Sequence, residues 1–245
     1  MIEDLLSLRL KFEQIKKIGW VESQRSGTTG IGYTFEKLLG KEEEQFAIPD
    51  YGTIEIKTRH RNSRESIGLF TAAPDGDYLF ATKKMYDEYG FPDSKNPELK
   101  VFYASMGTKF KHAGRDYQFR IQIDKEANKI KIIALDKVGN IIDTEVSWSL
   151  EMIKQKVETK LKYLAFVKAD SKFICGKQYF NYYSLVFYMI RGFNTFIKLI
   201  EKDIIHVTFM VGVYRTGPKK GMMYNHGVRF DIREENLDKL FIAIC

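Results

Sequence analysis

The sequence predicts an α/β protein, in which helical and strand patterns alternate along the chain. Residues 2–18 repeat apolar side chains at helical spacing. Residues 54–58 and 117–123 instead alternate apolar and polar side chains, as half-buried strands do. With 245 residues and 44% hydrophobic content, the chain is long enough to bury a core, as one large domain or as two lobes around a shared cleft.

Further elements follow the first helix in order. Residues 23–32 form a polar, glycine-rich loop, and residues 33–39 predict a helix that ends at Gly40. The loop lacks the Gly-Lys-Ser/Thr ending of a nucleotide-binding loop, which leaves backbone contacts to DNA phosphates as its functional alternative. The next predicted elements are short strands at 69–73 and 79–82, a helix at 83–89 and a buried strand at 101–106.

The second half of the chain begins with a predicted β-meander and closes with a hairpin. The meander covers residues 117–142, and the later predictions are helices at 148–164 and 193–203, with a strand at 165–172 between them. Six aromatic residues between Tyr179 and Tyr188 favour a helix packed into the core, with a base-stacking surface as the alternative. Residues 204–214 and 224–232 predict strands joined by a cationic turn.

The most informative stretch runs from Pro49 to Thr58. Asp50 lies beside a proline and two residues before a glycine, which is typical of a turn. Glu55 and Lys57 lie two residues apart on the predicted strand, so their side chains point to the same face. We therefore expect a carboxylate from the turn to converge with a carboxylate and an ammonium from the strand.

These groups suit metal-dependent hydrolysis of a phosphodiester. Mg²⁺ prefers oxygen ligands, and Asp50, Glu55 and the backbone carbonyl of Ile56 can supply them. Lys57 can stabilise charge on phosphorus or orient the attacking water. Glu36, in the predicted helix, is a candidate fourth acidic group. The alternative is a surface ion pair worth under ~1 kcal/mol, with Glu36 facing solvent.

Positive charge points to a polyanionic partner, nucleic acid first, because the net charge is +7. Arg59 and Arg61 follow the strand directly, where they would meet a phosphate backbone. A second cluster lies in the predicted hairpin and its turn. There Arg and Lys could hydrogen-bond to guanine and Asn to adenine. A solvated basic loop is the alternative for both clusters. The hairpin candidates are Arg215, Lys219, Lys220, Tyr224, Asn225, His226 and Arg229.

Other features exclude several classes of protein. The chain's two cysteines lie far apart, so neither a disulfide framework nor a zinc cluster is predicted, and the reducing cytoplasm fits. The acidic start differs from a secretory signal, and no apolar run reaches the ~18 residues of a membrane span. Three isolated histidines, His60, His112 and His206, are interpreted as structural or surface residues.

Taken together, the motifs resemble the PD-(D/E)xK nucleases of the MutH-like branch, and within it the MvaI/BcnI restriction endonuclease family. The catalytic resemblance rests on Gly30-x-Gly32, Phe35-Glu36-x-x-Leu39-Gly40, Pro49-Asp50 and Glu55-x-Lys57-Thr58. Two later segments, Arg215-x-x-Pro218-Lys219 and His226-Gly227-x-x-Phe230, resemble the DNA-recognition region of that branch. Residues 83–202 carry no matching motif.

The resemblance implies an α/β fold with a restriction-endonuclease-like core, a mixed central sheet flanked by helices, and two lobes around a DNA-binding cleft. Residues 1–110 would form mainly the catalytic lobe, and residues 111–245 mainly the recognition lobe with supporting helices. Asp50 and Glu55 would bind Mg²⁺, with Mn²⁺ as a substitute and Ca²⁺ binding without cleavage. Lys57 would be the catalytic lysine, and Glu36 would support the site.

The activity implied is that of a type II restriction endonuclease in a bacterial cytoplasm. It would act as a monomer on double-stranded DNA, cut a short C/G-rich pseudo-palindrome such as CC(A/T)GG and leave 5′-phosphates. A mismatch-repair nicking endonuclease of the same branch is one alternative, and it would need a repair protein to activate it. Another is a non-catalytic DNA-binding module, in which Asp50, Glu55 and Lys57 form a structural ion pair.

Overall fold

The chain folds into two compact units that interleave along the sequence. A computed structural model describes residues 2–40, 49–76, 79–114 and 116–244. Unit 1 comprises Met1–Glu65, Val157–Gly192 and Asp238–Cys245, and unit 2 comprises Ser66–Lys156 and Phe193–Leu237. The lobe boundary expected near residue 110 lies inside unit 2, because the chain leaves unit 1 after Glu65 and returns to it at Val157.

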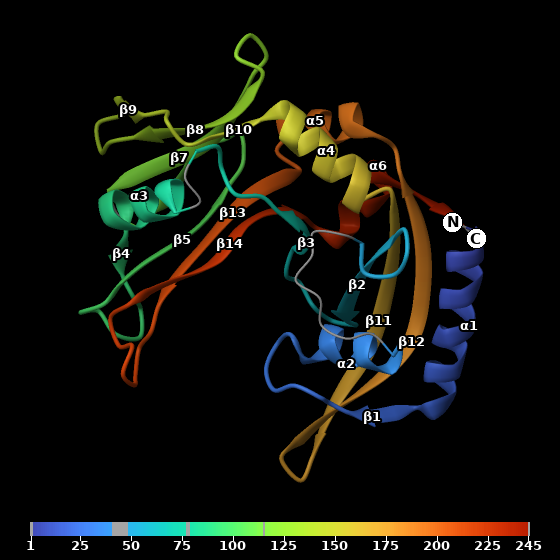
Figure 1. The fold of residues 1–245 in the computed structure, drawn as a ribbon. Helices are drawn as coiled ribbons and strands as arrows, with labels where there is room; N and C mark the ends of the chain where they lie inside the picture. The colour runs from blue at the N-terminus through green and yellow to red at the C-terminus, as the bar shows by residue number, and fades with distance from the viewer. Residues whose placement is uncertain (1, 41–48, 77–78, 115, 245) are drawn as a thin grey trace. The chain divides into compact units, whose positions relative to one another are not determined.

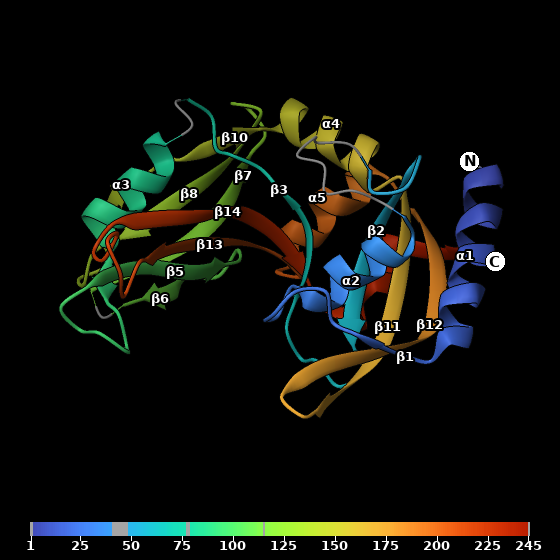
Figure 2. The same cartoon turned by 60° about the horizontal axis from the view of Figure 1, so that its bottom comes forward.

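Unit 1 is built on a mixed sheet with the strand order β1–β12–β11–β2, and β15 adds beside β12 (Figures 1 and 2). β2 and β11 run parallel, whereas the other neighbouring pairs are antiparallel. The predicted α/β class, with a mixed sheet and flanking helices, is confirmed. The elements of this unit are α1 (Ile2–Ile18), β1 (Trp20–Glu22), α2 (Gly30–Leu38), β2 (Ile54–His60), β11 (Tyr163–Ile174), β12 (Lys177–Ile190), α6 (Leu237–Leu240) and β15 (Phe241–Ile244).

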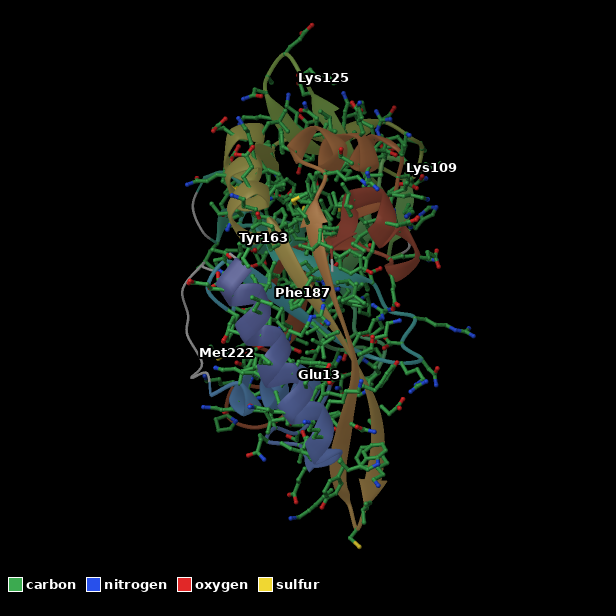
Figure 3. The ribbon with its side chains drawn as sticks, turned by 90° about the vertical axis from the view of Figure 1, so that its right-hand side faces the viewer. Glu13, Lys109, Lys125, Tyr163, Phe187 and Met222 are labelled. Atoms are coloured by element: carbon green, nitrogen blue, oxygen red, sulfur yellow. The ribbon has the colours of Figure 1, made fainter. Side chains whose placement is uncertain are left out.

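Helices α1 and α2 cover one face of this sheet. Figure 3 shows α1 lying across β11 and β12, with Glu13 on the helix and Tyr163 and Phe187 on the strands. The apolar stripe of α1 is buried in the same cluster as Ile54 and Ile56 of β2. Because side chains alternate along a strand, Glu55 and Lys57 point to the opposite face.

The aromatic-rich stretch at the start of β12 is a strand, so the predicted helix is wrong. Phe180, Tyr182 and Phe187 are buried in the core, as predicted, but they belong to a strand and not to a helix. The ladder between β11 and β12 is irregular and skips Tyr183. Such an extra residue interrupts the two-residue alternation that identifies a strand, so the aromatic spacing resembled a helix instead.

Unit 2 contains two antiparallel sheets that meet through aromatic rings. Their orders are β3–β14–β13–β5–β4 and β10–β8–β7–β6, with β9 beside β8. Trp148 of β10 lies 6.2 Å from Phe209 and 5.8 Å from Phe230 of the other sheet, ring centroid to ring centroid. Residues 79–82, predicted as a strand, instead begin helix α3. No helix in the described parts of either unit is long and apolar enough to cross a membrane.

The elements of unit 2 include three short strands, β4, β6 and β10, that were not predicted from the sequence. The elements of this unit are β3 (Ile67–Thr71), α3 (Phe80–Tyr89), β4 (Phe91–Pro92), β5 (Lys100–Met106), β6 (Lys111–Ala113), β7 (Tyr117–Asp124), β8 (Lys129–Leu135), β9 (Ile141–Asp143), β10 (Ser147–Ser149), α4 (Leu150–Lys160), α5 (Phe193–Glu201), β13 (Ile205–Val213), β14 (Met223–Ile232) and a 3₁₀ turn (Glu234–Asn236). Helix α4 begins in unit 2, and its last residues belong to unit 1.

Candidate active site

The centre of the candidate site is an ion pair on strand β2. Lys57 Nζ donates a hydrogen bond to Glu55 Oε1 at 2.7 Å, which confirms that the two side chains share one face of the sheet. Glu55 is only 2% exposed. A buried carboxylate is costly unless it is paired or binds a cation. This burial argues against the alternative of an ordinary surface ion pair.

Asp50 binds the outer edge of the same strand. Its Oδ2 accepts a hydrogen bond from the backbone N–H of Ile56 at 2.9 Å. Reciprocal backbone bonds between Tyr51 and Ile54, both 2.8 Å, close the turn that places Asp50 there. The N–H and C=O of one residue in a strand point to the same edge. The Ile56 carbonyl therefore faces the edge on which Asp50 lies, as the predicted ligand set requires.

A hard divalent cation fits these groups. Glu55 Oε2 is buried and, within the described residues, accepts no hydrogen bond. An unsatisfied buried acceptor is destabilising, and a cation would satisfy it. No group of three or more His, Cys, Asp or Glu side chains in the described part of the chain could hold a metal ion. The available donors are thus two carboxylates and a carbonyl, with water completing the shell, an arrangement that suits Mg²⁺.

Lys160, near the end of α4, is a site residue that the sequence did not reveal. Its Nζ lies 3.7 Å from Glu55 Oε2, and its side chain is 20% exposed. Two ammonium groups therefore flank the Glu55 carboxylate, one at each oxygen. A lysine in the last turn of a predicted helix is ordinary, so nothing in the local sequence distinguishes Lys160 from a solvated side chain.

Glu36 lies on α2, which packs on the other face of the sheet. A Cβ atom added to Gly32 would lie 3.2 Å from Thr58 Oγ1 and 3.9 Å from Glu36 Oε1, so α2 approaches β2 closely at this glycine. Burial raises the pKa of Tyr182, and the negative charge of Glu36 is a smaller cause. These neighbours belong to the helix-covered side of the sheet. The supporting role expected for Glu36 stays a prediction.

The two arginines that follow β2 differ in their surroundings. Arg59 is 7% exposed and donates through Nη2 to the carbonyls of Ser63, at 2.9 Å, and Glu65. These bonds fix the loop that follows β2. So buried a side chain is poorly placed for the phosphate contact that the sequence predicts. Arg61 is 53% exposed and makes a two-point ion pair with Asp170 at 2.6 and 2.8 Å.

The predicted cationic hairpin forms between β13 and β14 and borders an open pocket of about 480 Å³. The Tyr224 ring packs edge-on against His226, with centroids 4.8 Å apart. Gly212 makes room for this arrangement, because a Cβ there would lie 2.4 Å from Tyr224 Cζ and 2.5 Å from Tyr103 Oη. The pocket is lined by Val213, Tyr214, Arg215, Tyr224, Asn225 and His226.

Several hairpin side chains predicted to read DNA already have internal partners. Asn225 Nδ2 donates to Thr82 Oγ1 at 2.9 Å, and its Oδ1 accepts from the Gly227 N–H at 2.8 Å, so both ends of the amide are engaged. Arg229 pairs with the buried carboxylate of Asp231. Three other residues of this hairpin are better placed to contact DNA because their side chains are exposed: Lys219, Lys220 and His226.

Arg215 is held by a buried carboxylate, which leads to a prediction on stability. Its Nε and Nη2 donate to Asp93 at 2.6 and 2.9 Å. The hydrogen bond from Arg215 is the main cause that lowers the pKa of Asp93 from 3.8 to about 2. Ionised Asp93 therefore stabilises the fold fully above about pH 4, and this stabilisation is lost as the pH falls towards 2.

Arg215→Leu is accordingly expected to lower the urea midpoint of unfolding at pH 7. The difference in urea midpoint between the variant and the wild type should narrow as the pH falls from about 4 towards 2, because Asp93 then becomes protonated in both proteins. Lys220→Leu, at an exposed position of the same hairpin, is the matched control and should keep the wild-type midpoint. A gap that stays constant with pH would show that the ion pair is not its source.

Comparison with known proteins identifies a family and two similar solved structures. Residues 10–241 match the family model described as the MvaI/BcnI restriction endonuclease family. The solved complex of restriction endonuclease MvaI with its cognate DNA is similar, with a TM-score of 0.91 and 31% sequence identity, over 100% of this chain and 98% of that one. MvaI in the absence of DNA gives a TM-score of 0.61 at 32% identity, with the same coverage of both chains. No curated protein matches the sequence.

Proposed function

Because this chain belongs to the MvaI/BcnI restriction endonuclease family, we propose that it hydrolyses double-stranded DNA with Mg²⁺ at a short, C/G-rich pseudo-palindrome. CC(A/T)GG is the site we propose, with 5′-phosphates on the products and a monomer as the active form. Mn²⁺ would substitute for Mg²⁺, and Ca²⁺ would support binding without cleavage. The solved MvaI complex with cognate DNA supports duplex DNA as the substrate class.

The observation that carries this proposal is the environment of Glu55. Its carboxylate is buried, one oxygen accepts from Lys57 at 2.7 Å, and the other has no hydrogen-bond donor among the described residues. Asp50 lies on the adjoining edge of the strand through its bond to Ile56. A buried anionic oxygen, a second carboxylate and a lysine are the groups that a metal-dependent nuclease needs in one place.

Each residue then has a defined task in hydrolysis. When bound, a divalent cation supplies polarisation of the phosphate and acidification of water. Asp50, Glu55 and the Ile56 carbonyl would hold it. Lys57 places a positive charge where negative charge develops on the phosphate oxygens. The water oxygen bonds to phosphorus as the P–O3′ bond breaks, and the 3′-oxygen receives a proton, so the phosphate stays on the 5′ end.

The two alternatives predict different products. A nicking endonuclease would open one strand of the duplex and would need an activating protein. A DNA-binding module would retain DNA in a salt-dependent manner without cutting it. The buried carboxylate favours a catalytic site over a structural ion pair, because Oε2 has Lys160 at 3.7 Å but accepts no hydrogen bond from the described residues.

The test of site and end chemistry uses synthetic duplexes. We expect the purified protein to cut both strands of a duplex containing CC(A/T)GG in Mg²⁺ and to leave a duplex with one changed base intact. Ligation of the products without prior kinase treatment would establish 5′-phosphates. Cleavage of only one strand would instead support the nicking enzyme, and cleavage at a different sequence would correct the proposed site.

A further inference from the structure

The hairpin between β11 and β12 extends past the other strands of the unit 1 sheet. β2 pairs with β11 only as far as Ala169, and β1 begins to pair with β12 at Tyr179. Residues 172–177, called the hairpin tip below, therefore project as a two-stranded ribbon beyond α1, α2 and β1 (Figures 1 and 3). The tip carries Phe173, which is 71% exposed, and Ile174, which is 45% exposed.

The tip is closed by a tight turn. Cys175 and Gly176 have φ values of 49° and 77°, and they lie between the paired residues Ile174 and Lys177. Two consecutive positive φ angles in a two-residue loop are typical of a type I′ turn, whose twist matches that of the flanking strands. The turn thus presents Phe173 and Ile174 on opposite faces of an ordered ribbon. Both side chains are therefore exposed to a partner that encloses the ribbon.

The surroundings of the tip favour a polyanion. Lys172 Nζ lies 4.1 Å from the Trp20 ring centroid, a contact that orients the ammonium, and the residue is half-buried. Beside Phe173, an open pocket of about 440 Å³ is lined by Arg25, Lys177 and Glu22 among others. Lys177 itself pairs with Glu22 at 2.9 Å. Cations therefore border the apolar side chains on both faces of the ribbon.

Strand β11 connects the tip to the candidate active site. Leu164 of β11 opposes Glu55, and Lys172 follows it by an even number of residues on the same strand, so both side chains emerge on the face of Glu55. At ~3.3 Å per residue the separation along the strand is roughly 26 Å. A DNA strand advances ~3.4 Å along its axis per phosphate. A duplex whose axis runs in the direction of β11 would thus reach the tip roughly eight nucleotides from the reacting phosphate.

We propose that the hairpin tip binds the DNA duplex that flanks the cleavage site, outside the recognised bases. Lys172 contacts a phosphate, and Phe173 and Ile174 pack against sugar and base edges of a groove. Grooves accept both a two-stranded ribbon and apolar side chains of this size. The contact does not read sequence. The inference rests on the proposed function, since the substrate duplex is the partner.

Alkylation of Cys175 tests the contact directly, because this cysteine forms the turn and is exposed. A Cys245→Ser background leaves Cys175 as the chain's remaining thiol. In Ca²⁺, saturation with a duplex that extends about 15 base pairs beyond the site on each side should slow maleimide addition roughly tenfold. A duplex that ends about three base pairs from the site should leave the rate unchanged. Equal rates with both duplexes would overturn the proposal.

A kinetic comparison separates this inference from the proposed function. The double variant Phe173→Ser/Ile174→Ser should raise KM for the long duplex about tenfold, keep kcat and cut the short duplex as the wild type does. Leu6→Ser, at a 59% exposed apolar position on α1, is the matched control. Wild-type KM in the double variant would overturn the tip contact alone. Failure of the wild-type protein to cut either duplex would overturn the proposed function instead.

Discussion

Replacing Lys57 with alanine is expected to lower the rate of DNA cleavage by at least about 10³-fold while leaving specific DNA binding in Ca²⁺ intact. The ammonium of Lys57 lies 2.7 Å from Glu55 Oε1 and faces the same side of the sheet. Its loss removes a positive charge from the place where the transition state gains negative charge. Lys160 remains 3.7 Å from the other oxygen of Glu55, so the buried carboxylate keeps a counter-charge and the fold should persist.

Single-turnover cleavage in Mg²⁺ and gel shifts in Ca²⁺ measure the two halves of this prediction. Lys162→Ala is the matched control, because Lys162 is an exposed lysine immediately before β11 and should be dispensable. Undiminished cleavage by the Lys57→Ala variant would refute the catalytic assignment. Loss of specific binding together with cleavage would mean that Lys57 positions the DNA and does not act mainly on the reacting phosphate.

Glu55→Gln is expected to abolish cleavage and, unlike Lys57→Ala, to remove the stimulation of DNA binding by Ca²⁺. The amide keeps the volume of the buried side chain but carries no charge with which to hold a divalent cation. It also leaves the ammonium groups of Lys57 and Lys160 without the anion between them. Cleavage and the stimulation of DNA binding by Ca²⁺ should be lost together, because the same carboxylate binds the cation and pairs with the two lysines.

The measurement is a titration of DNA affinity against Ca²⁺ for the wild type and both variants. We expect the affinity of the wild type and of Lys57→Ala to rise with Ca²⁺, and that of Glu55→Gln to stay flat. Glu151→Gln, which removes one exposed carboxylate from the same helix as Lys160, controls for the change in net charge. A Ca²⁺ response in Glu55→Gln equal to that of the wild type would place the cation elsewhere.

The core of the candidate site could be predicted because its geometry is local. A turn signal before Asp50 and a two-residue period from Ile54 to Thr58 were enough to place Glu55 beside Lys57. The sheet confirms that prediction and adds the bond from Ile56 to Asp50. Helix α1 and the hairpin of β13 and β14 could be predicted for the same reason, since each depends on periodicity within one segment.

The remaining features depend on partners that lie far away in the sequence. Arg215 binds Asp93, which is 122 residues distant, and Lys160 reaches Glu55 only because β11 returns parallel to β2. The burial of Arg59 likewise follows from the loop that it holds, not from its own neighbours. The sequence predicts DNA contacts for Arg59 and Arg215, because charge alone does not reveal an internal partner.

Digestion of a plasmid of known sequence in Mg²⁺ by the wild-type protein, beside an Asp50→Ala variant, tests directly whether this site cleaves DNA. We expect discrete linear fragments from the wild type and intact plasmid from the variant, since Asp50 supplies a carboxylate at the edge of β2. Fragments of equal intensity from both proteins would contradict the assignment of the site to Asp50, Glu55 and Lys57.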